Sequence, residues 1–424
     1  MLKKSQKHLF IKPIGNFGSH IVILTFLTSL LVYNQSIKQE IAYFMVIGVL
    51  SLFPILFSTN YKIKREICFF FKKSKPIIFA FLLYWLIMVI NIRYVTSLIN
   101  VVFIFGYLYS FFICFFFLCP VIQGASIDIK RFFVFLGLFL TFIALAGYIT
   151  GEINFGVFKI QTFRMYQRAT FYLPGFNSIF NNQNTFGSLI LICLFSAVFI
   201  YFTKKGFFNA YLIICIFLFF GLVFSCARSS YVGFAVSLFF LPLVSKYSRK
   251  KYVIILFISF IIAISMVALN DKIILLGQDF MQLDKTYTRS YLTKASLNAI
   301  MAKPLFGYGQ SDFPPLLQSF SYIDLRNMGP HNTFLKTLLS SGIIGFVSYL
   351  LIILISLRRA FYMSKRGSIT SQWLFCLICG MIVHFYFEVR SLGGLGTIPL
   401  TFSFFLGWVN YIYLKFIQAN KCRS

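Results

Sequence analysis

The chain of 424 residues is 59% hydrophobic and only 12% charged, which excludes an ordinary soluble domain because too few polar side chains remain to cover its core. A formal net charge of +29 would suggest nucleic acid binding in a soluble protein, but the Lys and Arg residues lie mostly between apolar segments of membrane-spanning length. The sequence therefore predicts an all-α, polytopic integral membrane protein, a single membrane domain over residues 1–424, whose basic residues set its topology.

The N-terminal segment resembles a signal peptide in being basic from Lys3 to Lys12 and then apolar. The apolar run ends in Tyr33-Asn34-Gln35 and has no small-x-small cleavage pattern. We expect it to be retained as the first membrane span.

Apolar segments long enough to cross about 30 Å of hydrocarbon recur along the chain and predict about 12 transmembrane helices. In chain order they are Ile21–Tyr33, Ile41–Ser58, Ile77–Ile90, Leu98–Val121, Phe132–Thr150, Phe186–Phe202, Phe207–Phe224, Tyr231–Val244, Tyr252–Leu269, Phe334–Leu357, Trp373–Phe387 and Thr397–Leu414.

The charges of the connecting loops favour a topology with both termini in the cytoplasm. With the N-terminus inside, about 25 of the 39 Lys and Arg residues fall in cytoplasmic segments, as the positive-inside rule requires. The alternation of basic and less basic loops never slips, which favours an even number of spans.

Two predicted external segments, residues 151–185 and 270–332, are too long to be simple turns. Within the second, Ser290–Ala302 has apolar residues at helical spacing, Lys303-Pro304 ends that pattern, and Gly307-Tyr308-Gly309 turns the chain. We expect a short helix there, lying on the membrane surface.

Acidic residues are few and fall almost entirely outside the predicted spans. This argues against a proton- or cation-coupled transporter, which needs carboxylates at the bilayer midplane.

His384 and Glu388 lie near the outer end of one span and have two interpretations. They could form a structural hydrogen-bonded pair, which we favour, or a proton site. The cysteines have no zinc-site spacing, and we expect neither a metal nor a cofactor.

Two external segments carry side chains suited to catalysis. His331 lies where the second long loop re-enters the membrane, between Pro330, which fixes a turn, and Asn332, which caps the next helix. A histidine there could accept a proton from a hydroxyl near neutral pH. Arg228, in a hairpin on the same outer face, could bind a phosphate with two hydrogen bonds or anchor the chain at the lipid headgroups.

These segments together resemble the O-antigen ligase and polymerase superfamily of bacterial envelope enzymes, over roughly residues 180 to 350. The resemblance is carried by Ala227–Ser230, Arg289, Pro304–Gly309, His331–Leu335 and Ser341–Gly345. Asn181–Phe186 looks like the family's Asn-Pro-Asn segment with Gln183 in place of proline, a departure that affects the role carried over to it.

The resemblance implies a metal-independent, inverting glycosyltransferase in the bacterial inner membrane, with its site facing the periplasm or exterior and its ligase-like core in residues 186–357. The donor would be a glycan on undecaprenyl diphosphate. His331 would activate the acceptor hydroxyl, and Arg228 and Arg289 would bind the diphosphate. Further candidates for substrate binding are Arg164, Arg168, Asn332 and Tyr308.

The motifs leave three functions open. A polymerase would extend O-antigen or capsular repeat units on a lipid-linked acceptor, with a chain-length regulator as partner protein, and the idiosyncratic Phe-rich sequence favours it slightly. A ligase would join the finished glycan to lipid A core. A flippase for lipid-linked sugar would need polar residues along its spans and broken helices, and both signals are scarce.

Overall fold

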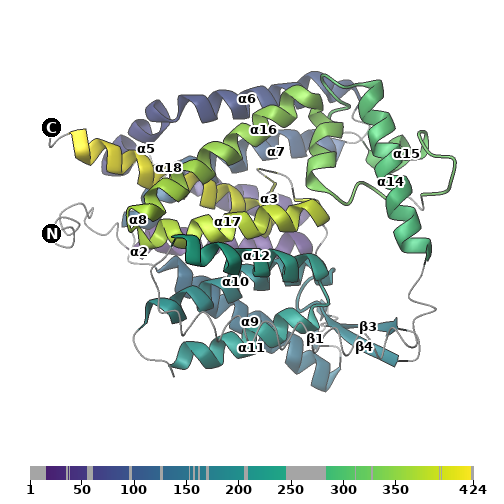
Figure 1. Ribbon diagram of the computed structural model, residues 1–424, viewed down its shortest axis with the longest axis horizontal. Coiled ribbons are helices and arrows are strands. Elements are labelled where there is room, and N and C mark those ends of the chain that lie inside the picture. The colour runs from purple at the N-terminus through teal and green to yellow at the C-terminus, as the bar shows by residue number, and fades with distance from the viewer. Residues whose placement is uncertain are drawn as a thin grey trace.

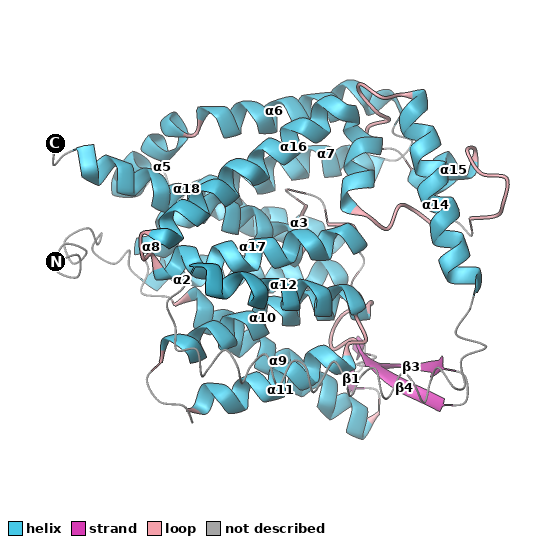
Figure 2. Ribbon diagram, viewed as in Figure 1, coloured by secondary structure: helices cyan, strands magenta, loops and turns pink. Residues whose placement is uncertain are grey.

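The computed structural model is largely helical (Figures 1 and 2). It describes residues 16–34, 37, 39–54, 61–94, 98–124, 128–151, 153–155, 158–160, 163–168, 171–204, 209–244, 283–310, 312–325, 328–390, 392 and 394–421.

Fifteen α-helices make up most of the described chain. They are α2 (Asn16–Leu30), α3 (Gln39–Leu50), α5 (Tyr61–Lys73), α6 (Lys75–Ile90), α7 (Leu98–Phe112), α8 (Leu118–Gly124), α9 (Ile129–Thr150), α10 (Gln183–Thr203), α11 (Ala210–Phe224), α12 (Arg228–Val244), α14 (Leu283–Ala302), α15 (Phe313–Gln318), α16 (Thr333–Lys365), α17 (Ile369–Phe387) and α18 (Thr397–Lys421). Shorter turns are the 3-10 helices η2 (Leu31–Tyr33) and η3 (Asn91–Tyr94) and the π-helix η4 (Ile113–Phe117).

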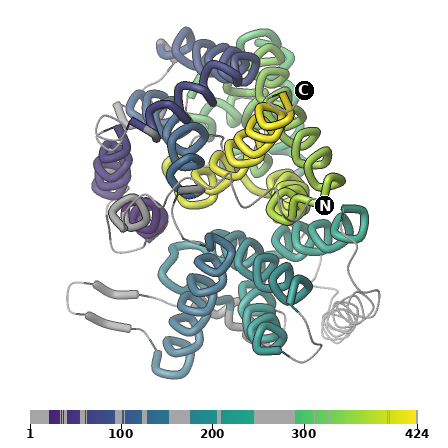
Figure 3. Tube along the Cα trace, turned by 90° about the vertical axis from the view of Figure 1, so that its left-hand side faces the viewer, coloured from purple at the N-terminus to yellow at the C-terminus, as the bar shows by residue number. Residues whose placement is uncertain are grey.

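The bundle is organised around α10, whose most apolar stretch is completely buried by other helices. Helices α9, α11, α12 and α17 pack around it. Viewed nearly along the helix axes, the middle of the chain, α9 to α12, groups on one side, and the N- and C-terminal helices group on the other (Figure 3). A helix apolar on all sides fits this central position, because it has no polar face to present to water.

Within the part of the chain that the structure describes, six helices are long and apolar enough to cross a membrane. They are the helix from Ile104 to Ile122, α9, α10, α16, α17 and α18, and the bent pair α5–α6 would make a seventh. Helices are found at all the predicted spans within the described chain, whereas Tyr252–Leu269 lies outside it. The predicted number of about 12 is not reached by this measure, because α2, α3, α11 and α12 are short.

The first of the two long segments that the sequence predicts to be external contains two β-hairpins, which an all-α prediction did not include. β1 (Ile153–Phe155) pairs antiparallel with β2 (Phe158–Ile160), and β3 (Phe163–Arg168) pairs antiparallel with β4 (Phe171–Phe176). The strands lie together at one corner of the molecule, at the right-hand end of the bundle in Figure 2.

The second long segment contains the expected helix, which is longer than predicted. α14 runs from Leu283 to Ala302 and includes the predicted Ser290–Ala302. It lies with α15 across the same end of the bundle as the hairpins, at a steep angle to the long helices (Figure 1). This part of the chain has a small apolar core of its own, separate from the main core of the bundle. Its buried residues include Leu292, Ala295, Leu317 and Leu325.

The segment Pro304–Gly309 joins α14 to a break in α16. Gly342 has φ +59° and ψ −168°, a conformation essentially restricted to glycine, which interrupts the helix. The N–H groups of Tyr308 and Gly309 donate to the carbonyls of Leu339 and Ser340 at 2.7 and 2.8 Å. On the other side of the break, the N–H of Ile343 donates to the carbonyl of Pro304 at 2.8 Å.

This set of backbone hydrogen bonds between Pro304–Gly309 and the break in α16, here called the interlock, explains the glycines of two sequence motifs, Pro304–Gly309 and Ser341–Gly345. A Cβ atom on Gly307 would collide with the Leu339 carbonyl, and one on Gly342 would collide with the Leu305 carbonyl. Both glycines are therefore required by a backbone-to-backbone contact. The backbone groups freed by the break are paired by Pro304–Gly309, so this broken helix is not an open coordination site of the kind found in transporters.

Candidate functional site

Helix ends that are distant in sequence meet at the right-hand end of the bundle in Figure 1. These are the N-termini of α10, α12 and α16 and the C-terminus of α17, beside α14, α15 and the hairpins. The structure therefore places Arg228, the first residue of α12, and His331, which precedes α16, at one end of the molecule.

His331 is exposed and is held immediately outside the N-terminus of α16. The next residue, Asn332, caps that helix, and its Oδ1 accepts hydrogen bonds from the N–H groups of Phe334 at 2.8 Å and Leu335 at 3.2 Å. The predicted capping role of Asn332 is confirmed. Because the Asn332 carboxamide oxygen is bonded to these two backbone N–H groups, the backbone that leads from His331 into α16 has a fixed conformation.

Arg228 is exposed at the start of α12, after a tight turn. The Ala227 N–H donates to Ser225 Oγ at 3.2 Å, and Cys226 has φ +53°. The turn packs closely on α10, where a Cβ on Gly187 would lie 2.5 Å from the Cβ of Ala227. Gly187 thus lets the Arg228 turn approach the Asn-rich start of α10.

The start of α10 is hydrogen-bonded to the end of α17 through His384 and Glu388, the two residues for which the sequence left two interpretations open. Asn184 Nδ2 donates to Glu388 Oε1 at 2.6 Å. Ser188 Oγ and His384 Nε2 lie 2.7 Å apart in a buried hydrogen bond. Each residue of the His384 and Glu388 pair thus bonds to α10, which favours the structural interpretation and gives the Asn-rich segment a role in positioning.

Thr333 and Arg390 connect α16 to the segment after α17, and sequence reasoning missed both. Thr333 is buried, and its hydroxyl donates to the Glu388 carbonyl at 2.6 Å and accepts from the Arg390 N–H at 2.8 Å. Arg390 is only 9% exposed, and its guanidinium donates through Nη2 to Thr185 Oγ1 at 3.3 Å. The hydroxyl of Thr333 therefore helps to fix the backbone at Arg390.

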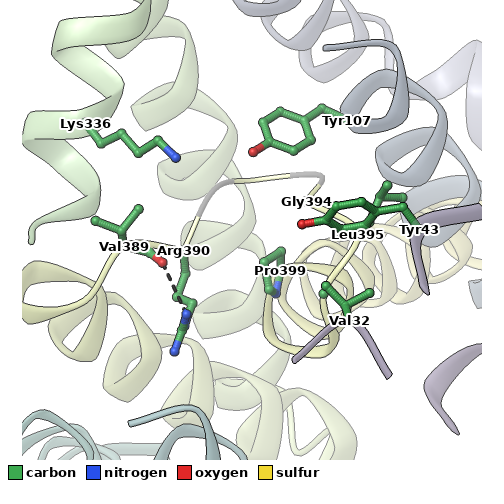
Figure 4. Close-up of a pocket in the computed structure, with 10 residues that line it drawn as sticks. Val32, Tyr43, Tyr107, Lys336, Val389, Arg390, Gly394, Leu395 and Pro399 are labelled. Carbon is green, nitrogen blue, oxygen red and sulfur yellow. Dashed lines mark hydrogen bonds between the residues drawn. The ribbon is translucent and has the colours of Figure 1, made fainter. Parts of the chain in front are cut away.

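A cavity of about 100 Å³ opens beside Arg390. Figure 4 shows the Lys336 ammonium reaching into it from α16, facing Tyr107 of α7, with Arg390 below and Tyr43 of α3 on the far side. Sequence reasoning also missed Lys336. It is a charged residue inside the predicted span Phe334–Leu357, which is itself a signal of function in a membrane protein.

The remaining predicted substrate residues are placed less directly. Tyr308 is buried in the small core, with the Lys303 ammonium 4.5 Å from its ring centre, so it packs rather than faces a substrate. Arg289 lies in α14, and Arg164 and Arg168 lie on β3, so the backbone places all three at this end of the molecule. Among the residues that the structure describes, no group of three or more His, Cys, Asp or Glu residues is arranged to hold a metal.

The fold and this end of the bundle define a helical, multi-pass membrane protein with histidine and arginine side chains displayed at helix N-termini. Residues 213–350 match the family model described as O-antigen ligase. The match covers about one third of the chain, from α11 into α16, and includes Arg228, Arg289 and His331. It confirms the resemblance to the O-antigen ligase and polymerase superfamily. No match was found among the curated proteins.

Proposed function

We propose that the protein is a metal-independent glycosyltransferase that moves a glycan from undecaprenyl diphosphate to an acceptor hydroxyl. The observation that carries this proposal is the exposure of His331 and Arg228 at the N-termini of α16 and α12, at one end of the bundle and inside the region that matches the ligase family.

The chemistry assigned to these residues is a single displacement. His331 takes the proton of the acceptor hydroxyl as its oxygen attacks the anomeric carbon, and the bond from that carbon to the diphosphate oxygen breaks. Arg228 and Arg289 neutralise the charge that grows on the departing undecaprenyl diphosphate. One direct attack without a covalent intermediate inverts the configuration of the anomeric carbon.

The orientation that we propose places this end of the bundle on the periplasmic or outer face of the inner membrane, with both termini and about 12 spans arranged as the loop charges indicate. The opposite end is consistent with a cytoplasmic face. Glu66 of α5 binds Lys415 of α18 there, at 2.7 Å, and Asp128 binds Lys130 at 3.6 Å before α9. These are the two acidic residues that the topology assigns to the inside.

The acceptor that we propose is a second lipid-linked repeat unit, which makes the protein a polymerase of O-antigen or capsular glycan, acting with a chain-length regulator. A ligase would use lipid A core in place of that acceptor. The flippase reading is not favoured, because the break in α16 is filled by backbone hydrogen bonds from Pro304–Gly309.

Turnover by the purified protein tests the proposal. Undecaprenyl-diphosphate repeat units are supplied as the only substrate in the presence of a chelator, and products are resolved by length. We expect a ladder of longer lipid-linked glycans with the wild type and at least a hundredfold loss of rate with His331→Ala, the range for a general base. Arg228→Ala should also lose activity, because it removes a diphosphate contact.

Arg131→Ala is the matched control, because Arg131 is an exposed arginine near the start of α9, at the other end of the bundle. It should leave the ladder unchanged. A ladder that appears only when lipid A core is added would assign the ligase reaction. Absence of product with either acceptor, or full activity of His331→Ala, would reject the transferase.

A further inference from the structure

The cavity beside Arg390 is positively charged on more than one wall. The ten residues that line it include Lys336 and Arg390 but no Asp or Glu. Its floor includes Gly396 and Pro399, where α18 begins, and a helix N-terminus carries a partial positive charge. The nearby carboxylate of Glu388 is bonded to Asn184 and does not line the cavity.

The Lys336 ammonium makes no hydrogen bond or ion pair with any residue that the structure describes, whereas the backbone N–H of Lys336 donates to the Asn332 carbonyl at 2.9 Å. The ammonium lies 5.8 Å from the ring centre of Phe313, which is a weak cation–π contact. Removing an ammonium from water without a partner costs more free energy than such a contact returns. The side chain therefore needs an anion or water in the cavity that it faces (Figure 4).

We infer that this cavity is an anion-binding subsite for a phosphate or carboxylate group of the glycan substrate, an inference that rests on the proposed transferase function. A space of about 100 Å³ exceeds what a single water molecule needs and admits such a group. Lys336 and Arg390 both supply positive charge that would bind the anion. The hydroxyl of Tyr107 lies opposite the Lys336 ammonium.

The position of the subsite links it to His331. Lys336 lies one helical turn from the cap Asn332, about 6 Å along the axis of α16, and His331 immediately precedes that cap. Thr333, between them, bonds to the backbone N–H of Arg390. An anion held by Lys336 and Arg390 would therefore be fixed relative to His331 by a single short segment of chain.

Anion binding to the purified protein tests the subsite without relying on turnover. The probes are inorganic diphosphate, which represents the donor, and glucuronate, which represents an acidic sugar. The controls are glucose, an uncharged sugar, and chloride at the ionic strength of the probe solutions. We expect saturable binding by calorimetry of at least one of the two anions to the wild type, weakened about tenfold or more in Lys336→Gln, because a charge-assisted hydrogen bond is lost.

Lys336→Arg should retain most of the affinity, and Lys365→Gln, at the other end of the same helix, should retain all of it. Because Arg228 and Arg289 are also proposed to bind diphosphate, only binding that is weakened in Lys336→Gln is assigned to the cavity. Such binding of diphosphate alone identifies the donor as the source of the anion, that of glucuronate alone identifies an acidic sugar, and that of both supports the shared chemistry. The subsite is overturned if neither anion binds better than glucose and chloride, or if folded Lys336→Gln binds as the wild type does.

The two proposals fail in different ways. Anion binding that depends on Lys336, in a protein that makes no glycan product with either acceptor, would reject the transferase and leave the subsite. A normal ladder from a protein that binds neither anion would reject the subsite alone.

Discussion

Single hydroxyl and amide groups hold the candidate site in position. Asn332 directs the chain that carries His331, Asn184 bonds to the carboxylate of Glu388, and Thr333 fixes the backbone of Arg390. None of these groups would be identified as functional from its residue type alone, because asparagine and threonine are common at helix starts. Their importance lies in the partners that the fold brings to them from α17 and beyond.

Replacing Thr333 tests this positioning at the residue scale. Thr333→Val keeps the shape but leaves the Arg390 N–H, which is buried, and the Glu388 carbonyl, which is partly buried, without their hydroxyl partner. We expect a loss of about 1–3 kcal/mol in stability, seen as a lower unfolding midpoint in detergent, together with weaker anion binding. Thr333→Ser retains the hydroxyl and should retain the anion affinity. Equal midpoints for the Val variant and the wild type would contradict the role assigned to this hydroxyl.

At the scale of elements, the contact between Pro304–Gly309 and the break in α16 attaches the segment that contains α14 and α15 to the bundle. Helix α14 reaches the membrane helices directly through this segment, and Asn91 of η3 adds a side-chain hydrogen bond to the Phe306 carbonyl at 2.7 Å. The first turns of α16, which carry Thr333 and Lys336, are thereby fixed at both ends, by the cap and by the interlock.

Gly342→Ala should disrupt this contact. The added Cβ would meet the Leu305 carbonyl, and the backbone conformation at Gly342 disfavours any other residue by about 1–3 kcal/mol even without the collision. We expect a marked fall in the yield of folded protein and in the unfolding midpoint. Gly48→Ala is the control, because a Cβ there meets nothing within 4 Å and alanine favours a helix. Similar behaviour of the two variants would argue against the interlock.

Long apolar runs predicted the positions of the helices because length and composition alone decide whether a segment can be buried in lipid. The hairpins at 153–176 were not predicted, and the break at Gly342 was not foreseen because its backbone partners are distant in sequence. Lys336 and Arg390 were missed for a related reason. Their cavity is assembled from α3, α7, α16 and the start of α18, and no local pattern records that assembly.

At the scale of the whole molecule, the two ends of the bundle differ in what they display. One end has the long connections, the hairpins and the helix N-termini with His331 and Arg228. The other end has the Lys415–Glu66 and Lys130–Asp128 ion pairs. A transferase that uses a lipid-linked glycan on the outer face requires the first end to be outside, and the loop charges independently favour that orientation.

Cysteine labelling tests this orientation at positions before and after α16. Tyr322 is fully exposed in the connection between α15 and α16, and Arg366 is exposed at the C-terminus of α16. Tyr322→Cys should gain reactivity with a membrane-impermeant maleimide in spheroplasts, relative to the wild-type chain and its exposed Cys68. Arg366→Cys should gain it only after lysis. Because α16 is long enough to span the membrane, we expect the two sites to lie on opposite sides. The reverse pattern would place His331 in the cytoplasm, and a reaction with glycans displayed outside would then be impossible.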